Sequence, residues 1–211
     1  METLTLYTGS VNPRHIERAA EVLRAGGVIV FPTDTLYAFG CDALNSKAIE
    51  RICRLKGLNP DKNLLSIVCD SISVAAEYAR IDNRAFRHLK NSLPGPYTFI
   101  LPAATTLPKV FKGRKSVGIR VPSNPIATAL AAELGNPLLA SSVTPVDPSD
   151  PDSVAEAADP AAIALRYENI ADISLVLDGG EGSTVPSTIV DLTDSSSPAL
   201  LRKGAGDWDE E

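Results

Sequence analysis

Small hydroxyl side chains and single basic side chains recur in this sequence where expected strands end. The first group is Thr33-Asp34-Thr35, which follows the apolar run 27–31 directly after Pro32. The other members follow the same pattern, and they are Lys56, Ser116, Arg120, Ser141, Ser142, Ser187, Thr188 and Arg202. One such residue alone is typical of a turn or a helix cap. Their recurrence indicates a shared pocket, because α/β sheets bind ligands beyond the carboxyl ends of their strands.

The common signatures of nucleotide loops, metalloproteases and serine hydrolases are absent from the sequence. The two histidines, His15 and His88, lie in expected helices far from other candidate ligands, so we interpret them as structural or surface residues. Cys41, Cys53 and Cys69 are odd in number and show no C-x-x-C spacing. We therefore expect no disulfide framework, no metal site formed by the protein, and a reducing, cytoplasmic location.

The charges are unevenly distributed along the chain. The formal net charge is −6, yet residues 84–132 contain no acidic side chain and several basic ones. Such a block indicates a phosphate-bearing ligand or nucleic acid, and the alternative is a solvated surface with acids nearby in space. Within this block we expect Lys112, Arg114 and Lys115 to form a loop that attracts polyanions such as RNA.

The expected elements alternate, as in α/β proteins. We expect strands at 4–7, 27–31, 64–68, 97–101, 116–121, 137–141, 174–178, 187–192 and 198–202, and helices at 12–24, 47–55 (capped by Ser46), 71–80, 83–92, 125–135 and 160–168. The late strands are too closely spaced for crossover connections, so part of the sheet must be antiparallel. No internal repeat or long linker divides the 211 residues. This predicts one α/β domain with a mixed sheet, without a membrane span or signal peptide.

Six blocks of the sequence resemble the YrdC-like family, the threonylcarbamoyl-AMP synthases. In order they read GVIVFPTDTLYAFGCDA, RICRLKG, LPGPYTFIL, VGIRVPSNPIA, PSTIVDLT and LLRKGAG, and the longer stretches look most like the YciO branch. The resemblance predicts a YrdC-like domain over residues 1–206, followed by an acidic tail at 207–211. It implies a single-domain, twisted, open mixed sheet flanked by helices. The Thr-Asp-Thr turn would form part of the wall of its large, positively charged concave face.

The family reaction implied by this resemblance joins L-threonine, bicarbonate and ATP. A carbamate of threonine attacks the α-phosphate, which gives threonylcarbamoyl-AMP and pyrophosphate, and the adenylate then serves tRNA modification. Such chemistry needs no protein nucleophile, because the enzyme positions the reactants and neutralises phosphate charge. Magnesium is expected with ATP.

The same resemblance assigns roles to particular residues of this chain. Those expected at threonine are Thr35, Tyr37, Arg120 and Ser187. Those expected at the nucleotide are Lys56, Ser116, Ser141 and Arg202, with Lys56 stabilising phosphate charge.

Two positions depart from the family pattern. Leu58 stands where the family typically has an arginine, and Val143 where it typically has an asparagine. Three classes of function therefore stay open. The first is a threonylcarbamoyl-AMP synthase, and the second is a paralogue that binds double-stranded RNA, tRNA or the ribosome with weak or no synthase activity. The third is an enzyme acting on another nucleotide or phosphorylated metabolite.

Overall fold

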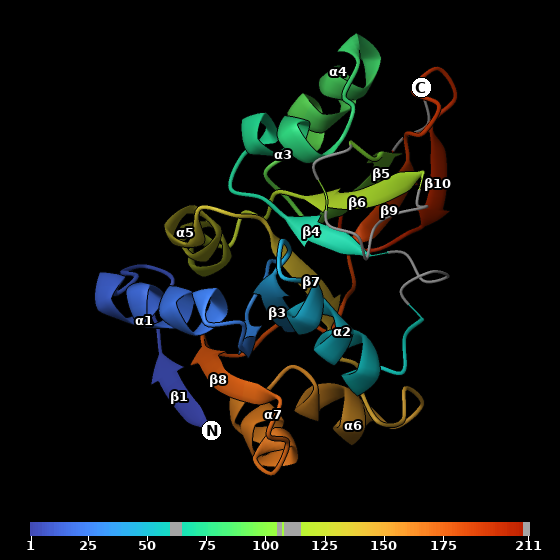
Figure 1. The fold of residues 1–211 in the computed structure, drawn as a ribbon. Coiled ribbons are helices and arrows are strands. Elements are labelled where there is room, and N and C mark those ends of the chain that lie inside the picture. The colour runs from blue at the N-terminus through green and yellow to red at the C-terminus, as the bar shows by residue number, and fades with distance from the viewer. Residues whose placement is uncertain (60–64, 105–106, 108–114, 209–211) are drawn as a thin grey trace.

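The computed structural model describes residues 1–59, 65–104, 107 and 115–208 (Figure 1). In this part of the chain, ten strands form one sheet in the order β1-β8-β2-β3-β7-β4-β6-β5-β9-β10. The strands are β1 (Glu2–Thr5), β2 (Val28–Phe31), β3 (Ala38–Asp42), β4 (Ser66–Val68), β5 (Tyr97–Pro102), β6 (Ser116–Arg120), β7 (Leu138–Ser142), β8 (Ile173–Asp178), β9 (Thr188–Asp191) and β10 (Ala199–Arg202).

The sheet mixes parallel and antiparallel pairs, as the sequence predicts. Strand β8 runs parallel to both β1 and β2, and the pairs β4–β6 and β5–β9 are also parallel. The pairs β2–β3, β3–β7, β4–β7, β5–β6 and β9–β10 are antiparallel. The late strands β8 and β9 lie far apart in the sheet, and only the last hairpin, β9–β10, joins sequence neighbours there. The expected α/β class and mixed sheet are confirmed.

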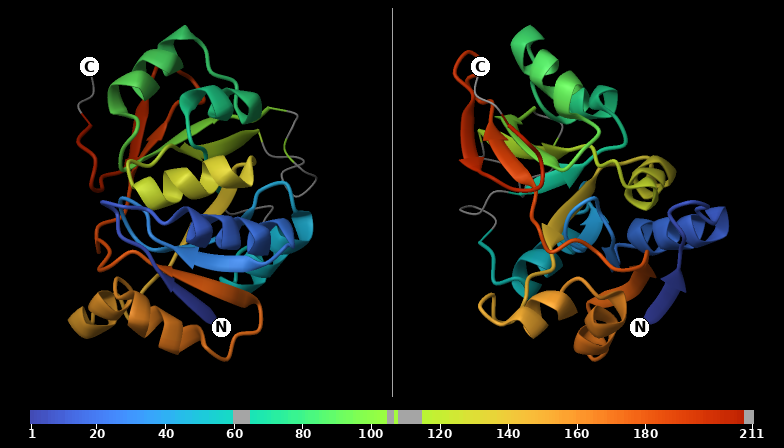
Figure 2. Two further views of the ribbon diagram at one scale, coloured as in Figure 1. Left: turned by 90° about the vertical axis from the view of Figure 1, so that its left-hand side faces the viewer. Right: turned by 180° about the vertical axis from the view of Figure 1, so that it is seen from behind.

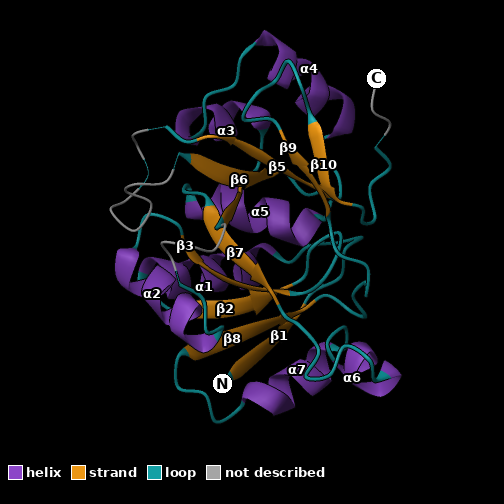
Figure 3. Cartoon of the chain, turned by 90° about the vertical axis from the view of Figure 1, so that its right-hand side faces the viewer, coloured by secondary structure: helices purple, strands orange, loops and turns teal. Residues whose placement is uncertain are grey.

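Helices cover both faces of the sheet (Figures 2 and 3). They are α1 (Pro13–Arg24), α2 (Ser46–Leu55), α3 (Ile72–Tyr78), α4 (Asn83–Ser92), α5 (Pro125–Leu134), α6 (Pro151–Glu156) and α7 (Pro160–Tyr167). On one face, α1 and α5 lie side by side and bury Leu23 and Leu130 against Phe31. On the other face, α2 and α4 contribute Ile52 and Leu89 to a larger core. No helix in the described part of the chain is long and apolar enough to cross a membrane.

Two elements differ from the expected pattern. Strand β3 was not expected, because its sequence AFGCD is buried on both faces and has no alternation of apolar and polar residues. Helix α6 lies between the expected strand at 137–141 and the expected helix at 160–168, where no helix was expected; Asp150 caps it and Pro151 occupies its first turn. The expected cap of α2 was also wrong, since Asn45 accepts a hydrogen bond from the Ala48 amide at 3.1 Å.

The start of the expected acidic tail packs against the sheet. The Tyr97 hydroxyl donates to the Asp207 carbonyl at 2.7 Å. The Trp208 ring lies 5.9 Å from the Phe99 ring and 5.4 Å from the His88 ring, measured between centroids. Residues 209–211 lie outside the described residues. The proposed division at residue 206 stays a prediction.

Burial in the central strands should dominate the stability of the fold. We expect Leu139→Ala in β7, where the side chain is fully buried, to lower the free energy of unfolding by about 2–5 kcal/mol. The matched change Leu201→Ala in the edge strand β10 should cost less than about 0.5 kcal/mol, because Leu201 is 57% exposed. Urea denaturation measures both values, and equal losses would contradict this account of the core.

Candidate functional site

The guanidinium of Arg120 lies at the end of β6 beneath the Thr33–Thr35 turn. Its Nη2 atom lies 2.9 Å from Thr35 Oγ1, 3.0 Å from Asp34 Oδ1 and 3.4 Å from Thr33 Oγ1. The arginine is only 5% exposed, and its Nε has no hydrogen-bond partner among the described atoms. A buried donor without an acceptor is costly, so the geometry suits a ligand that brings one.

Asp34 connects this guanidinium to the loop that precedes α5. One carboxylate oxygen pairs with Arg120, and the other accepts from the backbone amide of Ser123 at 3.2 Å. The Asn124 side chain caps α5 and also donates to the Thr33 carbonyl at 3.3 Å. Burial lowers the pKa of Arg120, and the attraction of Asp34 opposes that effect. The ion pair therefore holds the charged guanidinium in a fixed position inside the protein.

Tyr37 closes the same turn on its other side. Its hydroxyl donates to the Gly180 carbonyl at 2.6 Å and accepts from the Gly179 amide at 3.0 Å. Burial is the main cause that raises the pKa of Tyr37 to about 12. The Ser183 amide donates to the Thr35 carbonyl at 3.2 Å. The segment after β8 is thus fastened over the Thr33–Thr35 turn.

A second cluster joins Ser187, Thr98 and Arg202. The Ser187 hydroxyl shares a hydrogen bond with Thr98 Oγ1 at 2.9 Å and accepts from Arg202 Nη2 at 3.1 Å. Arg202 also donates to the Ser187 carbonyl from Nε at 3.0 Å and from Nη2 at 2.8 Å. The positive charge of Arg202 contributes to lowering the pKa of Arg120, so the two guanidinium groups lie within electrostatic range. This arrangement favours an anion between or beside them.

The strand β6 carries polar side chains along the face between these clusters. Ser116, Gly118 and Arg120 alternate onto one face of the strand, because side chains repeat every second residue. A methyl group at Gly118 would lie 2.4 Å from Ser66 Oγ and 3.2 Å from Thr98 Cγ2. Glycine therefore lets the neighbouring polar side chains of β4 and β5 approach each other on this face.

Lys56 lies at a different corner, after α2 and beside the end of β7. Its ammonium group donates to the Ser142 carbonyl at 2.9 Å and to Thr144 Oγ1 at 3.0 Å. It also lies 5.8 Å from the centroid of the Phe39 ring. Ser141 pairs directly with Phe39 across β3 and β7, so its side chain is on the same face of the sheet as that ring.

The two departures from the family pattern lie in apolar surroundings at this corner. Leu58 packs against the larger core, and its amide donates to the Cys53 carbonyl at 2.8 Å. Val143 is fully buried, and its amide donates to the Tyr37 carbonyl at 2.7 Å. Neither side chain can bind phosphate. The structure therefore puts two apolar groups where the resemblance predicts a guanidinium and an amide.

The sequence-predicted residues thus form two hydrogen-bonded groups and one separate corner. Thr35 bonds Arg120 directly, Ser187 bonds Arg202, and Lys56 bonds neither pair. Lys115 is exposed just before β6, whereas Lys112 and Arg114 lie outside the described residues. Ser123 was missed as a candidate. Asp34 was expected only as part of the Thr33–Thr35 turn, and its pairing with Arg120 was not predicted.

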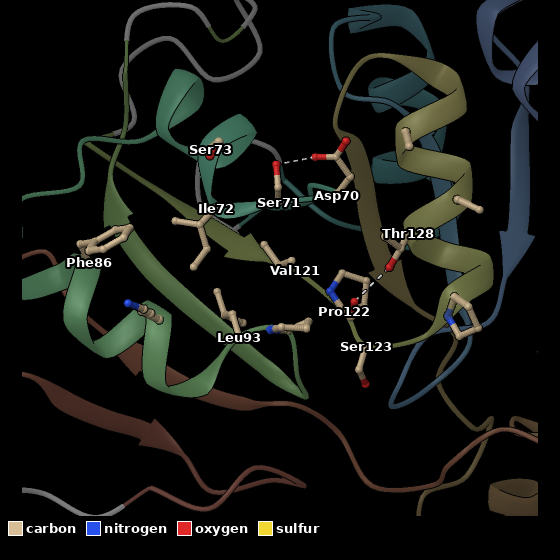
Figure 4. Close-up of a pocket in the computed structure, with 15 residues that line it drawn as sticks. Asp70, Ser71, Ile72, Ser73, Phe86, Leu93, Val121, Pro122, Ser123 and Thr128 are labelled. Carbon is tan, nitrogen blue, oxygen red and sulfur yellow. Dashed lines mark hydrogen bonds between the residues drawn. The ribbon is translucent and has the colours of Figure 1, made fainter.

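A groove of about 830 Å³ adjoins the site on the far side of Ser123 (Figure 4). Its floor is formed by Val121 and Pro122, and its walls come from α3, α4 and α5. Ile72, Phe86 and Leu93 line it on the side of α3 and α4. The groove is largely apolar, so it differs in chemistry from the polar face of β6.

The Asp34–Arg120 pair should be a strong stabilising contact of the site. We expect Asp34→Ala to lower the free energy of unfolding by about 3–5 kcal/mol, because it leaves a buried guanidinium charge without its carboxylate. Asp34→Asn retains one oxygen acceptor and should cost less. The double change Asp34→Ala with Arg120→Met should recover part of the loss, because the buried charge is removed. Denaturant unfolding measures all three, and a wild-type midpoint for Asp34→Ala would contradict this role.

Comparison with known proteins gives a consistent result over nearly the whole chain. The Sua5/YciO/YrdC family model, described as telomere recombination, matches residues 21–204. YciO of Escherichia coli K12 is 43% identical over 205 residues, which is 95% of each chain. The crystal structure of E. coli YciO superposes with a TM-score of 0.86 over 98% of both chains. The resemblance to the YciO branch is confirmed.

Proteins named threonylcarbamoyl-AMP synthase are among the relatives. That of Halorhodospira halophila is 35% identical over 145 residues, covering 68% of this chain and 76% of its own length. The structure of Pyrococcus abyssi Sua5 complexed with L-threonine has a TM-score of 0.83 at 31% identity, and the match covers 97% of this chain and 58% of that one. The chain belongs to the Sua5/YciO/YrdC family.

Proposed function

We propose that this protein binds L-threonine and ATP and forms threonylcarbamoyl-AMP from them and bicarbonate. The observation that carries the proposal is the buried guanidinium of Arg120, whose Nε lacks a partner among the described atoms. Arginine suits a carboxylate because its donors form a planar fork. The similarity to a Sua5 structure complexed with L-threonine supports L-threonine as a ligand of this chain.

In this proposal, the threonine carboxylate is bound by Arg120. The hydroxyls of Thr35 and Ser187 and the ring of Tyr37 complete the threonine pocket. Asp34 Oδ1 accepts a hydrogen bond from Arg120 Nη2 at 3.0 Å. This contact restrains the guanidinium and leaves its Nε unpaired. An amino acid held in one orientation presents its nitrogen, and the carbamate formed on it, in a defined direction.

The nucleotide would lie along the polar face of β6 and the corner at Lys56. Ser116, Ser141 and Arg202 are the proposed contacts, together with Lys56. Magnesium would accompany ATP, because Mg²⁺ takes oxygen ligands and commonly shares them with substrate phosphates. Within the described residues, no group of three or more His, Cys, Asp or Glu side chains could hold an ion by itself. We therefore assign the metal to the ATP complex.

The reaction requires the protein mainly to position the reactants and to supply positive charge near the phosphates. The carbamate oxygen attacks the α-phosphorus, the bond to the β-phosphate oxygen breaks, and pyrophosphate leaves with that electron pair. Charge develops on the departing phosphates, where cationic side chains lower the barrier. Leu58 and Val143 remove one cation and one amide relative to the family pattern, so we expect a slow synthase. A charged hydrogen bond is worth about 1.5–3 kcal/mol, or about tenfold to a hundredfold in rate.

The RNA-binding alternative depends on the acid-free block. In the described residues of this block, Arg84, Arg87 and Lys90 are exposed on α4, and Lys115 is exposed before β6. Arg120 is instead buried and paired with Asp34, so it does not belong to a basic surface. RNA binding stays a prediction. Action on another phosphorylated metabolite stays a prediction too.

Release of pyrophosphate from ATP tests the proposal directly. We expect release that requires both L-threonine and bicarbonate, above the rate with either one omitted. The control is the same protein with Arg120→Lys, which keeps the positive charge but loses the planar fork. Turnover that is independent of threonine would point to another substrate, and background turnover in the folded wild-type chain would contradict the synthase.

A ligand that lacks the carboxylate isolates the role of Arg120. Arg120→Lys should weaken L-threonine binding by about tenfold to a hundredfold, while ATP binding changes by less than about twofold. L-Threoninamide should bind the wild type weakly, and Arg120→Lys should not weaken it further, because the contact is already missing. Isothermal titration gives these affinities, and a melting curve verifies folding. An equal loss of threonine and threoninamide binding would instead indicate a structural role.

A further inference from the structure

Two cations converge on the end of β7, and only Lys56 was expected there. The Lys56 ammonium donates to Thr144 Oγ1 at 3.0 Å, and the guanidinium of Arg166 donates from Nη1 to the Thr144 carbonyl at 3.0 Å. Both charged groups therefore touch the same residue. They come from segments more than 100 positions apart, since Lys56 follows α2 and Arg166 lies in the last turn of α7.

These two cations have no acidic partner among the described residues. The ion pairs of that part of the chain involve Arg18, Arg24, Arg51, Arg54 and Arg120, and include neither Lys56 nor Arg166. Burial lowers the pKa of Lys56, and the positive charge of Arg166 lowers it further. Like charges that no described acidic group neutralises repel each other, so a bound anion would lower this cost.

Aromatic rings fix the two cations from below. Phe39 and Tyr167 meet edge to face with centroids 5.1 Å apart. The Lys56 nitrogen lies 5.8 Å from the Phe39 centroid, and the Arg166 guanidinium carbon lies 5.0 Å from the Tyr167 centroid. A cation over a ring face is attracted by the quadrupole of the ring, which helps to hold it in place. Arg166 is exposed, so its free donors can meet a ligand from solution.

We infer that Arg166 is a phosphate-binding residue, and that with Lys56 it forms a two-cation subsite for the polyphosphate part of the nucleotide. This inference rests on the proposed function. Part of the positive charge that Leu58 removes from the family pattern would then be supplied from α7. A guanidinium is well suited to the role, since its fork matches two phosphate oxygens.

Binding of inorganic tripolyphosphate and of magnesium-ATP tests the subsite. Arg166→Gln should weaken both by about tenfold, because one charge-assisted contact is lost. The matched control is Arg54→Gln, which removes an exposed arginine that pairs with Asp172 at 3.7 Å, and it should change both affinities by less than twofold. L-Threonine affinity should be unchanged in both variants. Titration calorimetry and melting curves supply the values.

A rescue variant separates phosphate binding from a purely structural contact to Thr144. Adding Leu58→Arg to Arg166→Gln should restore at least part of the tripolyphosphate affinity, whereas a lost contact to the Thr144 carbonyl would not be replaced from that position. If the wild type binds ATP and tripolyphosphate and Arg166→Gln binds them equally well, the inference is overturned and the proposed function stands. If the folded wild type binds neither ligand, the inference and the nucleotide part of the proposed function both fall.

Discussion

The buried ion pair between Arg120 and Asp34 is the interaction on which the site depends. A guanidinium that is 5% exposed must have acceptors, and the turn after β2 supplies two hydroxyls and a carboxylate on one Nη atom. The same carboxylate holds the Ser123 amide before α5. The contact between Arg120 and Asp34 thereby connects the turn after β2, the end of β6 and the segment that precedes α5. Because Nε is buried and unpaired among the described atoms, the pair is a structural joint that still has one donor without an acceptor.

The turn after β2, and not the pairing of neighbouring strands, makes this joint possible. Strands β2 and β6 are separated in the sheet by β3, β7 and β4, so neighbouring strands alone do not bring Arg120 to the turn. The turn of the antiparallel β2–β3 hairpin lies beyond the ends of these strands and reaches Arg120 at the end of β6, where Thr35 Oγ1 accepts from Nη2 at 2.9 Å. Ser187 and Arg202 arrive from the other end of the sheet through β9 and β10.

The positive charges in the two regions of the site are stabilised in different ways. Around Arg120, burial is compensated by a carboxylate, so the charge is fixed before any ligand arrives. Around Lys56 and Arg166, the described residues provide carbonyls, a hydroxyl and aromatic rings but no carboxylate. The first arrangement favours precise orientation of a small ligand. The second arrangement has positive charge without a carboxylate partner among the described residues, which suits a larger anion, for which attraction matters more than exact geometry.

The sequence alone determined the α/β class, the mixed sheet and the family. It did so because buried strands, helix caps and six ordered blocks are local features that need no knowledge of the folded chain. It also singled out Thr35, Arg120, Ser187 and Arg202 individually. Strand β3 was not predicted from the sequence, because a strand buried on both faces has no alternation of apolar and polar residues. Only tertiary structure decided that Asp34 holds Arg120, and that Arg166 of α7 reaches the corner of Lys56, because charge partners distant in sequence leave no local pattern.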